Sequence, residues 1–265
     1  MRQTKFFIPF VVALVITLIL GVLLVALELG GNPDETTVPT PEETEPQGKE
    51  VPAVTFAADL DEYEEFMNVK DDKYLILVNK ANTIDESFTP EKLVPVVDAK
   101  KNIELSETAE KALEAMFEEM RAQGFGNVFV TSAYRSYNYQ YGLFFNTYIP
   151  QEMATGLSFD KAKEKVLTYS AYPGTSEHHT GLCVDLMTTS MRELDESFAD
   201  EAVYPWLLEN AWKFGFILRY PKYKVDITGY SFEPWHYRFV GRHHAYMMHS
   251  EGLCLEEYLL VGTIA

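Results

Sequence analysis

An uncharged apolar run from Phe6 to Leu27 is the feature that most restricts how this chain can fold. Its length, about 22 residues or roughly 33 Å as a helix, matches the hydrocarbon core of a bilayer and exceeds the apolar stretch of most signal peptides. Arg2 and Lys5 precede the run and Glu28 follows it, a charge order that places the N-terminus in the cytoplasm. We therefore expect residues 1–29 to form a cytoplasmic stub and an uncleaved transmembrane anchor, with a cleaved signal peptide as the alternative.

The following segment, residues 30–70, is predicted to be an acidic linker rich in Pro, Thr and Glu. Its early part cannot bury enough apolar surface to fold, and its charges and prolines keep it extended. Residues 64–70 either continue the linker or form a first small element. We expect a tether that holds a folded domain, residues 71–265, outside the membrane.

The composition of the whole chain argues against two classes of partner. A formal net charge of −18 argues against nucleic acid, which needs a basic face, and against broad docking on anionic lipid. The two cysteines, Cys183 and Cys254, are too few for a disulfide scaffold. We expect two buried thiols, with a single bridge as the alternative, and we expect a monomer.

The pattern after residue 71 predicts a mixture of helices and strands. Ser106 is a candidate N-cap for a helix to about Gln123, because apolar residues recur there at helical spacing and Gly124 follows. Further helices are predicted from Ser136 or Asn138 to Tyr148 and over 159–167, 204–214 and, as the last helix, 243–249, which residues 255–260 follow. Strands are predicted over 74–78, 128–131, 182–186, 216–220 and 235–240. Because strands and helices do not alternate regularly, we expect an α+β fold in which helices flank a small antiparallel sheet.

Two segments, 176–185 and 233–238, hold the residues best suited to metal chemistry. Zinc in catalytic sites takes His nitrogens and carboxylate oxygens and keeps one position open. His178, Asp185 and His236 would supply two nitrogens and one oxygen, with Gly181 allowing a sharp turn. Glu233, in a loop at the entrance of a strand, could take a proton from water and pass it to a leaving amine. For either segment alone, ordinary surface or core histidines are the alternative; together the two segments favour a metal site.

A third segment, 131–140, places Arg135 directly after a predicted strand and before a predicted helix. A fixed guanidinium at such a position can stabilise an oxyanion that faces a metal. The alternative is a surface salt bridge to one of the many carboxylates.

On these three segments the chain resembles the VanY-type zinc D,D-carboxypeptidases, relatives of the VanX dipeptidases and of bacterial L,D-carboxypeptidases. The family patterns are Ser-x-His-x-x-Gly-x-Ala-x-Asp, Glu-x-Trp-His and an upstream Tyr-Arg-Ser…Gln. The matching residues are Ser176, His178, Gly181, Asp185, Glu233, Trp235, His236, Tyr134, Arg135, Ser136 and Gln140. The similarity runs from about residue 74 to 260. It departs at Cys183, which stands where the pattern has Ala and which we interpret as a small buried residue rather than a competing ligand.

The resemblance implies a zinc-dependent enzyme that removes the terminal D-Ala from peptidoglycan stem peptides. The implied zinc ligands are His178, Asp185 and His236. The implied catalytic residues are Glu233 as general base and Arg135 on the scissile carbonyl oxygen. The residues implied to bind the peptide terminus are Gln140, Ser176 and Tyr220. The implied fold is the compact α+β domain shared with the Hedgehog signalling domain.

Several other functions remain open at the level of sequence. The same site could serve an L,D-carboxypeptidase that trims tetrapeptide stems, or an endopeptidase that cuts within the stem. A non-catalytic wall-binding module would be expected to lack a ligand or the base, and none is missing here. A membrane scaffold without chemistry is the remaining alternative.

Overall fold

The computed structural model describes residues 50–262 of the chain. The predicted anchor and most of the predicted linker lie outside the described residues. Within residues 50–262, no helix combines the length and the apolar character that crossing a membrane requires.

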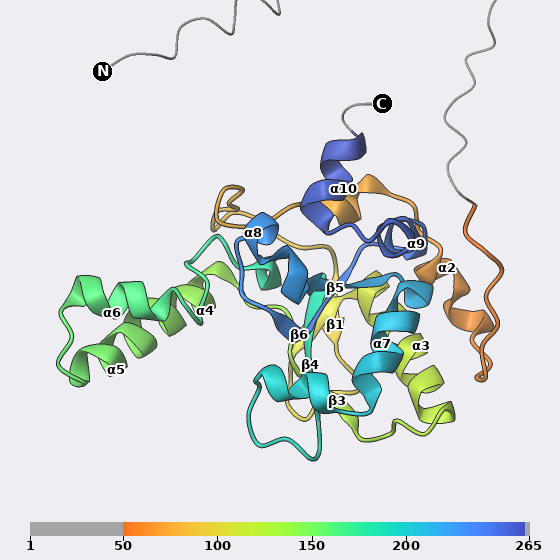
Figure 1. Ribbon diagram of the computed structural model, residues 1–265, viewed down its shortest axis with the longest axis horizontal. Helices are drawn as coiled ribbons and strands as arrows, with labels where there is room; N and C mark the ends of the chain where they lie inside the picture. The colour runs from red at the N-terminus through yellow and green to blue at the C-terminus, as the bar shows by residue number, and fades with distance from the viewer. Residues whose placement is uncertain (1–49, 263–265) are drawn as a thin grey trace, which may run out of the picture. The chain divides into compact units, whose positions relative to one another are not determined.

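An antiparallel sheet of four strands in the order β3–β4–β6–β5 forms the centre of the domain (Figure 1). The strands are β3 (Val128–Ser132), β4 (Cys183–Thr188), β5 (Phe216–Tyr220) and β6 (Glu233–Phe239). A separate antiparallel pair joins β1 (Leu93–Pro95) and β2 (Glu104–Ser106). The predicted α+β class is confirmed, whereas the β1–β2 pair was not predicted.

One face of the central sheet packs against α3 (Glu107–Ala122). Val184 and Tyr237 are paired across β4 and β6 and therefore point to the same face, where they join the core that α3 covers. The buried residues of α3 in this core include Leu113, Met116 and Met120, so the predicted amphipathic helix is confirmed. The polar residues described below lie on the opposite face of β4 and β6.

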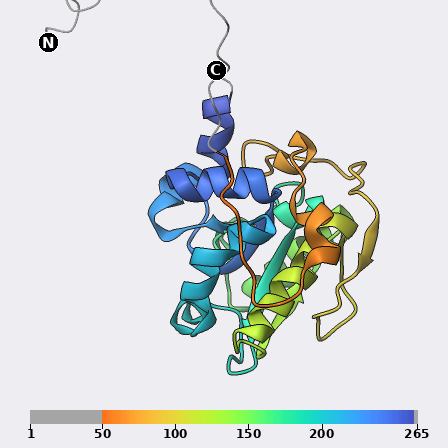
Figure 2. The ribbon, with the colours of Figure 1, turned by 90° about the vertical axis from the view of Figure 1, so that its right-hand side faces the viewer.

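A second apolar cluster joins the two ends of the described chain. It is formed by α9 (Arg242–Glu251), α10 (Leu255–Gly262) and neighbouring residues, and Val51 and Val54 pack against it. Figure 2 shows the N-terminal segment running beside these C-terminal helices. The domain also contains α2 (Glu64–Met67) and α7 (Val203–Asn210), whose buried residues join the main core, and α8 (Val225–Thr228).

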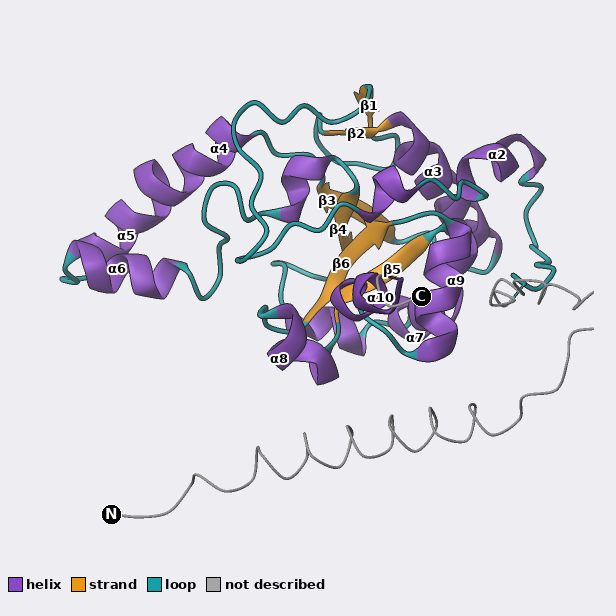
Figure 3. Cartoon of the chain, turned by 90° about the horizontal axis from the view of Figure 1, so that it is seen from above, coloured by secondary structure: helices purple, strands orange, loops and turns teal. Residues whose placement is uncertain are grey.

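A helical arm projects from the sheet, as Figures 1 and 3 show from two directions. It contains α4 (Tyr137–Tyr141), a π-helical segment (Gly142–Tyr148), α5 (Ile149–Ala154) and α6 (Phe159–Val166). The side chains of Ser136 and Ser158 cap α4 and α6, as predicted. The arm has a small core of its own around Phe144 and Val166. The helical path continues past the predicted end at Tyr148, because Pro150 falls in the first turn of α5, where a missing N–H costs little.

Two predictions about the start of the domain need correction. Residues 74–78 do not form a strand: the carbonyls of Tyr74 and Ile76 accept hydrogen bonds from Arg238 Nη2, at 2.8 and 2.9 Å, instead of from a neighbouring strand. Residues 56–63, predicted as linker, belong to the folded domain, and residues 64–70 include the first small element that was the alternative there, α2. Met67 is fully buried in the main core, and the backbone N–H groups of residues 57 and 58 donate to the Glu119 carboxylate.

Candidate metal centre

Two of the predicted metal ligands are direct partners across the central strands. Asp185 on β4 is in register with His236 on β6, so their side chains leave the same face of the sheet. His178 lies on a 3-10 turn, residues 177–180, that leads into β4. Gly181 ends this turn at φ +67°, and a Cβ there would lie 3.1 Å from Cβ of Pro90. A glycine thus lets the chain reverse tightly enough to bring His178 over the strand.

The three side chains converge at hydrogen-bonding distances. His178 Nε2 lies 3.2 Å from Asp185 Oδ2, and His236 Nδ1 lies 3.1 Å from Asp185 Oδ1. All three residues are 3–4% exposed. The other nitrogen of each ring has its own acceptor: His178 Nδ1 is 2.6 Å from the carbonyl of Ala133, and His236 Nε2 is 3.1 Å from Glu177 Oε2. The ring nitrogens that face Asp185, His178 Nε2 and His236 Nδ1, are therefore the candidate metal donors.

The donor set fits a zinc ion. Asp185 Oδ1 is buried and has no hydrogen bond of good geometry, an arrangement that a bound cation would satisfy. Burial opposes ionisation of Asp185, but the two histidines outweigh it and hold the pKa of the carboxyl well below its ordinary value. Two nitrogens and one carboxylate oxygen are the ligands of a catalytic zinc site with one open position.

Cys183 also points toward this cluster. Its Sγ and one nitrogen each of His178 and His236 lie within 4.8 Å of one another. Alternation along β4 puts Cys183 on the same face as Asp185, as predicted. Cys183 and Cys254 are both buried free thiols, so the predicted thiols are confirmed and the alternative disulfide is absent from the described residues.

Arg135 and Gln140 lie on the side of the site next to the helical arm. Arg135 Nη2 is 3.6 Å from Asp185 Oδ2, and its Nη1 donates to Gln140 Oε1 at 3.1 Å. Arg135 Nε is buried without a hydrogen-bond partner. The Gln140 amide donates to Ser170 Oγ and to the carbonyl of Ala171, and the residue is fully buried. Gln140 therefore reaches the site through Arg135, which it holds in place.

Glu233 and Tyr220 face the centre from the other side. Glu233 Oε2 lies 3.5 Å from His236 Nδ1, and burial raises the pKa of this carboxyl above its ordinary value. Glu233 is the first residue of β6 rather than part of the predicted loop, since Pro234 is tolerated at a strand's beginning. Tyr220 pairs with Glu233 across β5 and β6, and its ring centroid is 4.9 Å from that of His236. Ser176, also buried, immediately precedes the turn that carries His178.

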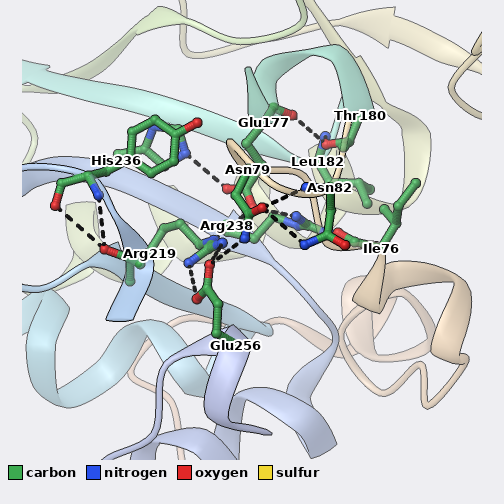
Figure 4. Close-up of polar contacts among 12 residues, drawn as sticks. Ile76, Asn79, Asn82, Glu177, Thr180, Leu182, Arg219, His236, Arg238 and Glu256 are labelled. Atoms are coloured by element: carbon green, nitrogen blue, oxygen red, sulfur yellow. Dashed lines mark hydrogen bonds and ion pairs between the residues drawn. The ribbon is translucent and has the colours of Figure 1, made fainter. Parts of the chain in front are cut away.

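A buried ionic cluster next to His236, drawn in Figure 4, was not predicted from the sequence. Glu177 is 2% exposed and contacts His236, Arg219 and Arg238. Burial alone would raise the pKa of Glu177, but the two arginines outweigh it and hold it below the ordinary range. In the sequence, Glu177 is marked only by its place beside His178. The two arginines that contact it come from β5 and β6, far along the chain, so their proximity cannot be read from sequence spacing.

Comparisons with known proteins point to one family. The profile of the family described as VanY, D-alanyl-D-alanine carboxypeptidase, matches residues 102–242. A D-alanyl-D-alanine carboxypeptidase of Enterococcus faecalis is 38% identical over 185 residues, which are 70% of this chain and 65% of the relative. The chain therefore spans slightly less than two thirds of that protein.

Two solved structures share the fold. One is the vancomycin resistance D,D-pentapeptidase VanY from a VanB-type cassette in complex with Zn(II): 37% identity, TM-score 0.59, covering 71% of this chain and 99% of that one. The other is the LD-carboxypeptidase LdcB, at 36% identity and TM-score 0.61, covering 72% of this chain and 88% of that one.

Proposed function

This chain belongs to the VanY family of D-alanyl-D-alanine carboxypeptidases, and from that premise we propose that it is a zinc enzyme that hydrolyses the terminal D-Ala from peptidoglycan stem peptides. The observation that carries the proposal is the convergence of His178 Nε2, Asp185 and His236 Nδ1 on one buried point. The Zn(II) complex of the related VanY structure supports the choice of metal. A zinc ion held by these residues would polarise the scissile carbonyl and make a water molecule more acidic.

Glu233 is placed to move the protons of the reaction. Its carboxyl lies next to the proposed ligand His236, at 3.5 Å, and keeps 28% of its side chain exposed, so water and substrate can reach it. We assign to it the removal of a proton from the attacking water and its delivery to the departing amine of D-Ala. The raised pKa of this carboxyl suits a group that must both accept and release a proton.

Arg135 is placed to bind negative charge on the substrate. Its Nε lacks a partner within the described residues, while Nη1 is held by Gln140. A guanidinium fixed in this way can donate to the carbonyl oxygen as charge develops there. Ser176 and Tyr220, buried beside the proposed ligands, would shape the place where the peptide terminus lies.

L,D-carboxypeptidase activity on tetrapeptide stems is a second candidate. It is favoured by the likeness to LdcB, which is as close in identity and fold as the likeness to the VanY structure. Both activities would use the same metal, base and arginine, and they differ only in the residue that precedes the D-Ala removed.

The cellular setting is part of the proposal. The apolar run 6–27 and the charges around it support a single-pass anchor with the catalytic domain outside the cytoplasm. Peptidoglycan stems are found there, and a domain of this size would act as a monomer tethered by the linker.

A peptide panel tests the function. The purified protein is incubated with a stem pentapeptide ending in D-Ala-D-Ala and with the corresponding tetrapeptide, with chelator and after zinc is restored, and products are followed by mass. Zinc-dependent loss of one alanine from the pentapeptide is expected. Loss of alanine from the tetrapeptide alone would indicate L,D specificity. Cleavage of neither peptide by the zinc-loaded protein would contradict the proposed carboxypeptidase activity.

A further inference from the structure

We propose that Glu177 is a positioning residue for the metal centre: its carboxylate holds the Nε2–H of His236, so that Nδ1 points to the metal, while Arg219 and Arg238 fix the carboxylate. This inference rests on the proposed zinc site and adds a residue to which no role in the reaction has been assigned above. Glu177 does not reach the open position, so it would act on the metal only through His236.

The two oxygens of the Glu177 carboxylate are divided between two tasks. Oε2 lies 3.1 Å from His236 Nε2. Oε1 accepts from Arg219 Nε at 2.8 Å and from Arg238 Nη1 at 2.6 Å. Because an ionised carboxylate only accepts hydrogen bonds, the proton on the imidazole must be on Nε2. A zinc ion bound between His236 and Asp185 would then take the lone pair of Nδ1, the nitrogen that faces Asp185 and Glu233.

The arginines are themselves held rigidly. Arg219 and Arg238 are completely buried. Arg219 makes a second, two-pronged contact with Glu256 of α10, at 2.8 and 2.7 Å. Arg238 donates to the carbonyls of Tyr74, Ile76 and Phe239. Two carboxylates thus balance two guanidinium groups, which is the condition under which buried charges are tolerated.

A purely structural role for the cluster is the competing explanation. The ion pairs to Arg219 and Arg238 would account for Oε1, but they leave Oε2 directed at a proposed metal ligand (Figure 4). His178 shows the same arrangement with a different acceptor, the carbonyl of Ala133 at 2.6 Å. Each histidine thus donates from the ring nitrogen that faces away from the metal, as ligands oriented by a second shell do.

The first test needs no variant. In the full-length protein loaded with zinc, the ring nitrogens of His236 are assigned by 15N–1H NMR. We expect Nε2 to carry a slowly exchanging proton and Nδ1 to be bound to metal. A metal-bound Nε2 with the proton on Nδ1 would overturn the proposal. If the wild-type chain takes up no zinc, the proposed function fails first, and the two failures are distinguishable.

The second test compares two matched variants by zinc affinity, measured by competition with a chelator. Glu177→Gln and Glu256→Gln each remove one carboxylate from Arg219, but only the first touches His236. We expect Glu177→Gln to weaken zinc binding by about 10–100-fold and Glu256→Gln to leave it within about twofold while lowering the melting temperature. Equal zinc affinity in the two variants would overturn the proposal. If Glu177→Gln does not fold, the NMR result decides.

Discussion

At the scale of single residues, the proposed metal ligands stand out in the sequence because residue type and local pattern mark them. His178 and Asp185 stand in one short segment with Gly181 between them, and Glu233 stands three residues before His236. Glu177 could not be assigned in this way. Its role depends on ion pairs with Arg219 and Arg238, which strand pairing brings together. Neither arginine has a fixed spacing from Glu177 in the sequence.

Cys183 provides a test at this scale. We expect Cys183→Ala to keep one zinc per chain and a kcat/KM within about threefold of the parent, because a buried cysteine packs as a small hydrophobe. A fourth protein ligand would also close the position that a catalytic site needs. Zinc content and peptide hydrolysis are measured together, with Cys254→Ala as the control. Loss of zinc from Cys183→Ala alone would show that the thiol is a ligand.

At the scale of elements, periodicity predicted the helices and most of the central sheet. α3 was found because apolar residues recur on one face, and β3 because its residues are β-branched or aromatic. Residues 74–78 have the composition of a strand, but the carbonyls of Tyr74 and Ile76 accept hydrogen bonds from the buried Arg238. A hydrogen bond between residues so far apart in the chain has no effect on the local sequence pattern. Composition alone therefore predicted a strand that does not form.

Glu110 on α3 makes the stability of this element depend on pH. Its side chain is 2% exposed, and burial raises its pKa from 4.5 to about 7. The folded state therefore holds a proton that the unfolded state releases between about pH 4.5 and 7, and stability from this group falls as pH rises through that window. Above pH 7, Glu110→Gln should be more stable by on the order of 1–3 kcal/mol.

The measurement is chemical denaturation of the parent and of Glu110→Gln at pH 5 and pH 8. The gain at pH 8 should shrink at pH 5, where the parent carboxyl is protonated as well. Glu65→Gln, at an exposed position of α2, is the control for removing a charge. An equal gain at both pH values would contradict the assignment of the shift to Glu110.

At the scale of the whole molecule, the sheet order brings distant segments of the chain to one site. β4 and β6 are neighbours, and β3 leads through Arg135 into the arm that contains Gln140. The family resemblance implied that these segments contribute to one site, but it did not predict the strand order. The residue patterns alone predicted the fold class but not the strand order, because register depends on contacts between segments far apart in sequence.

The cellular placement of the whole chain is tested by fractionation. We expect the full chain to remain in the membrane pellet after an alkaline wash, because the run 6–27 would be held in the hydrocarbon core. A chain lacking residues 1–49 should be soluble and keep its peptidase activity. If the mature protein has lost its N-terminus by mass and leaves the pellet, the segment is a cleaved signal peptide.

The most direct test of the central claim measures bound zinc and turnover on the same sample of Glu233→Gln. The amide keeps the shape of the side chain but cannot accept the proton of the attacking water. We expect one zinc per chain, as in the parent, with turnover of the preferred stem peptide lowered by on the order of 10²–10⁴-fold. Turnover close to that of the parent at full zinc content would contradict the role of Glu233 and the mechanism built on it.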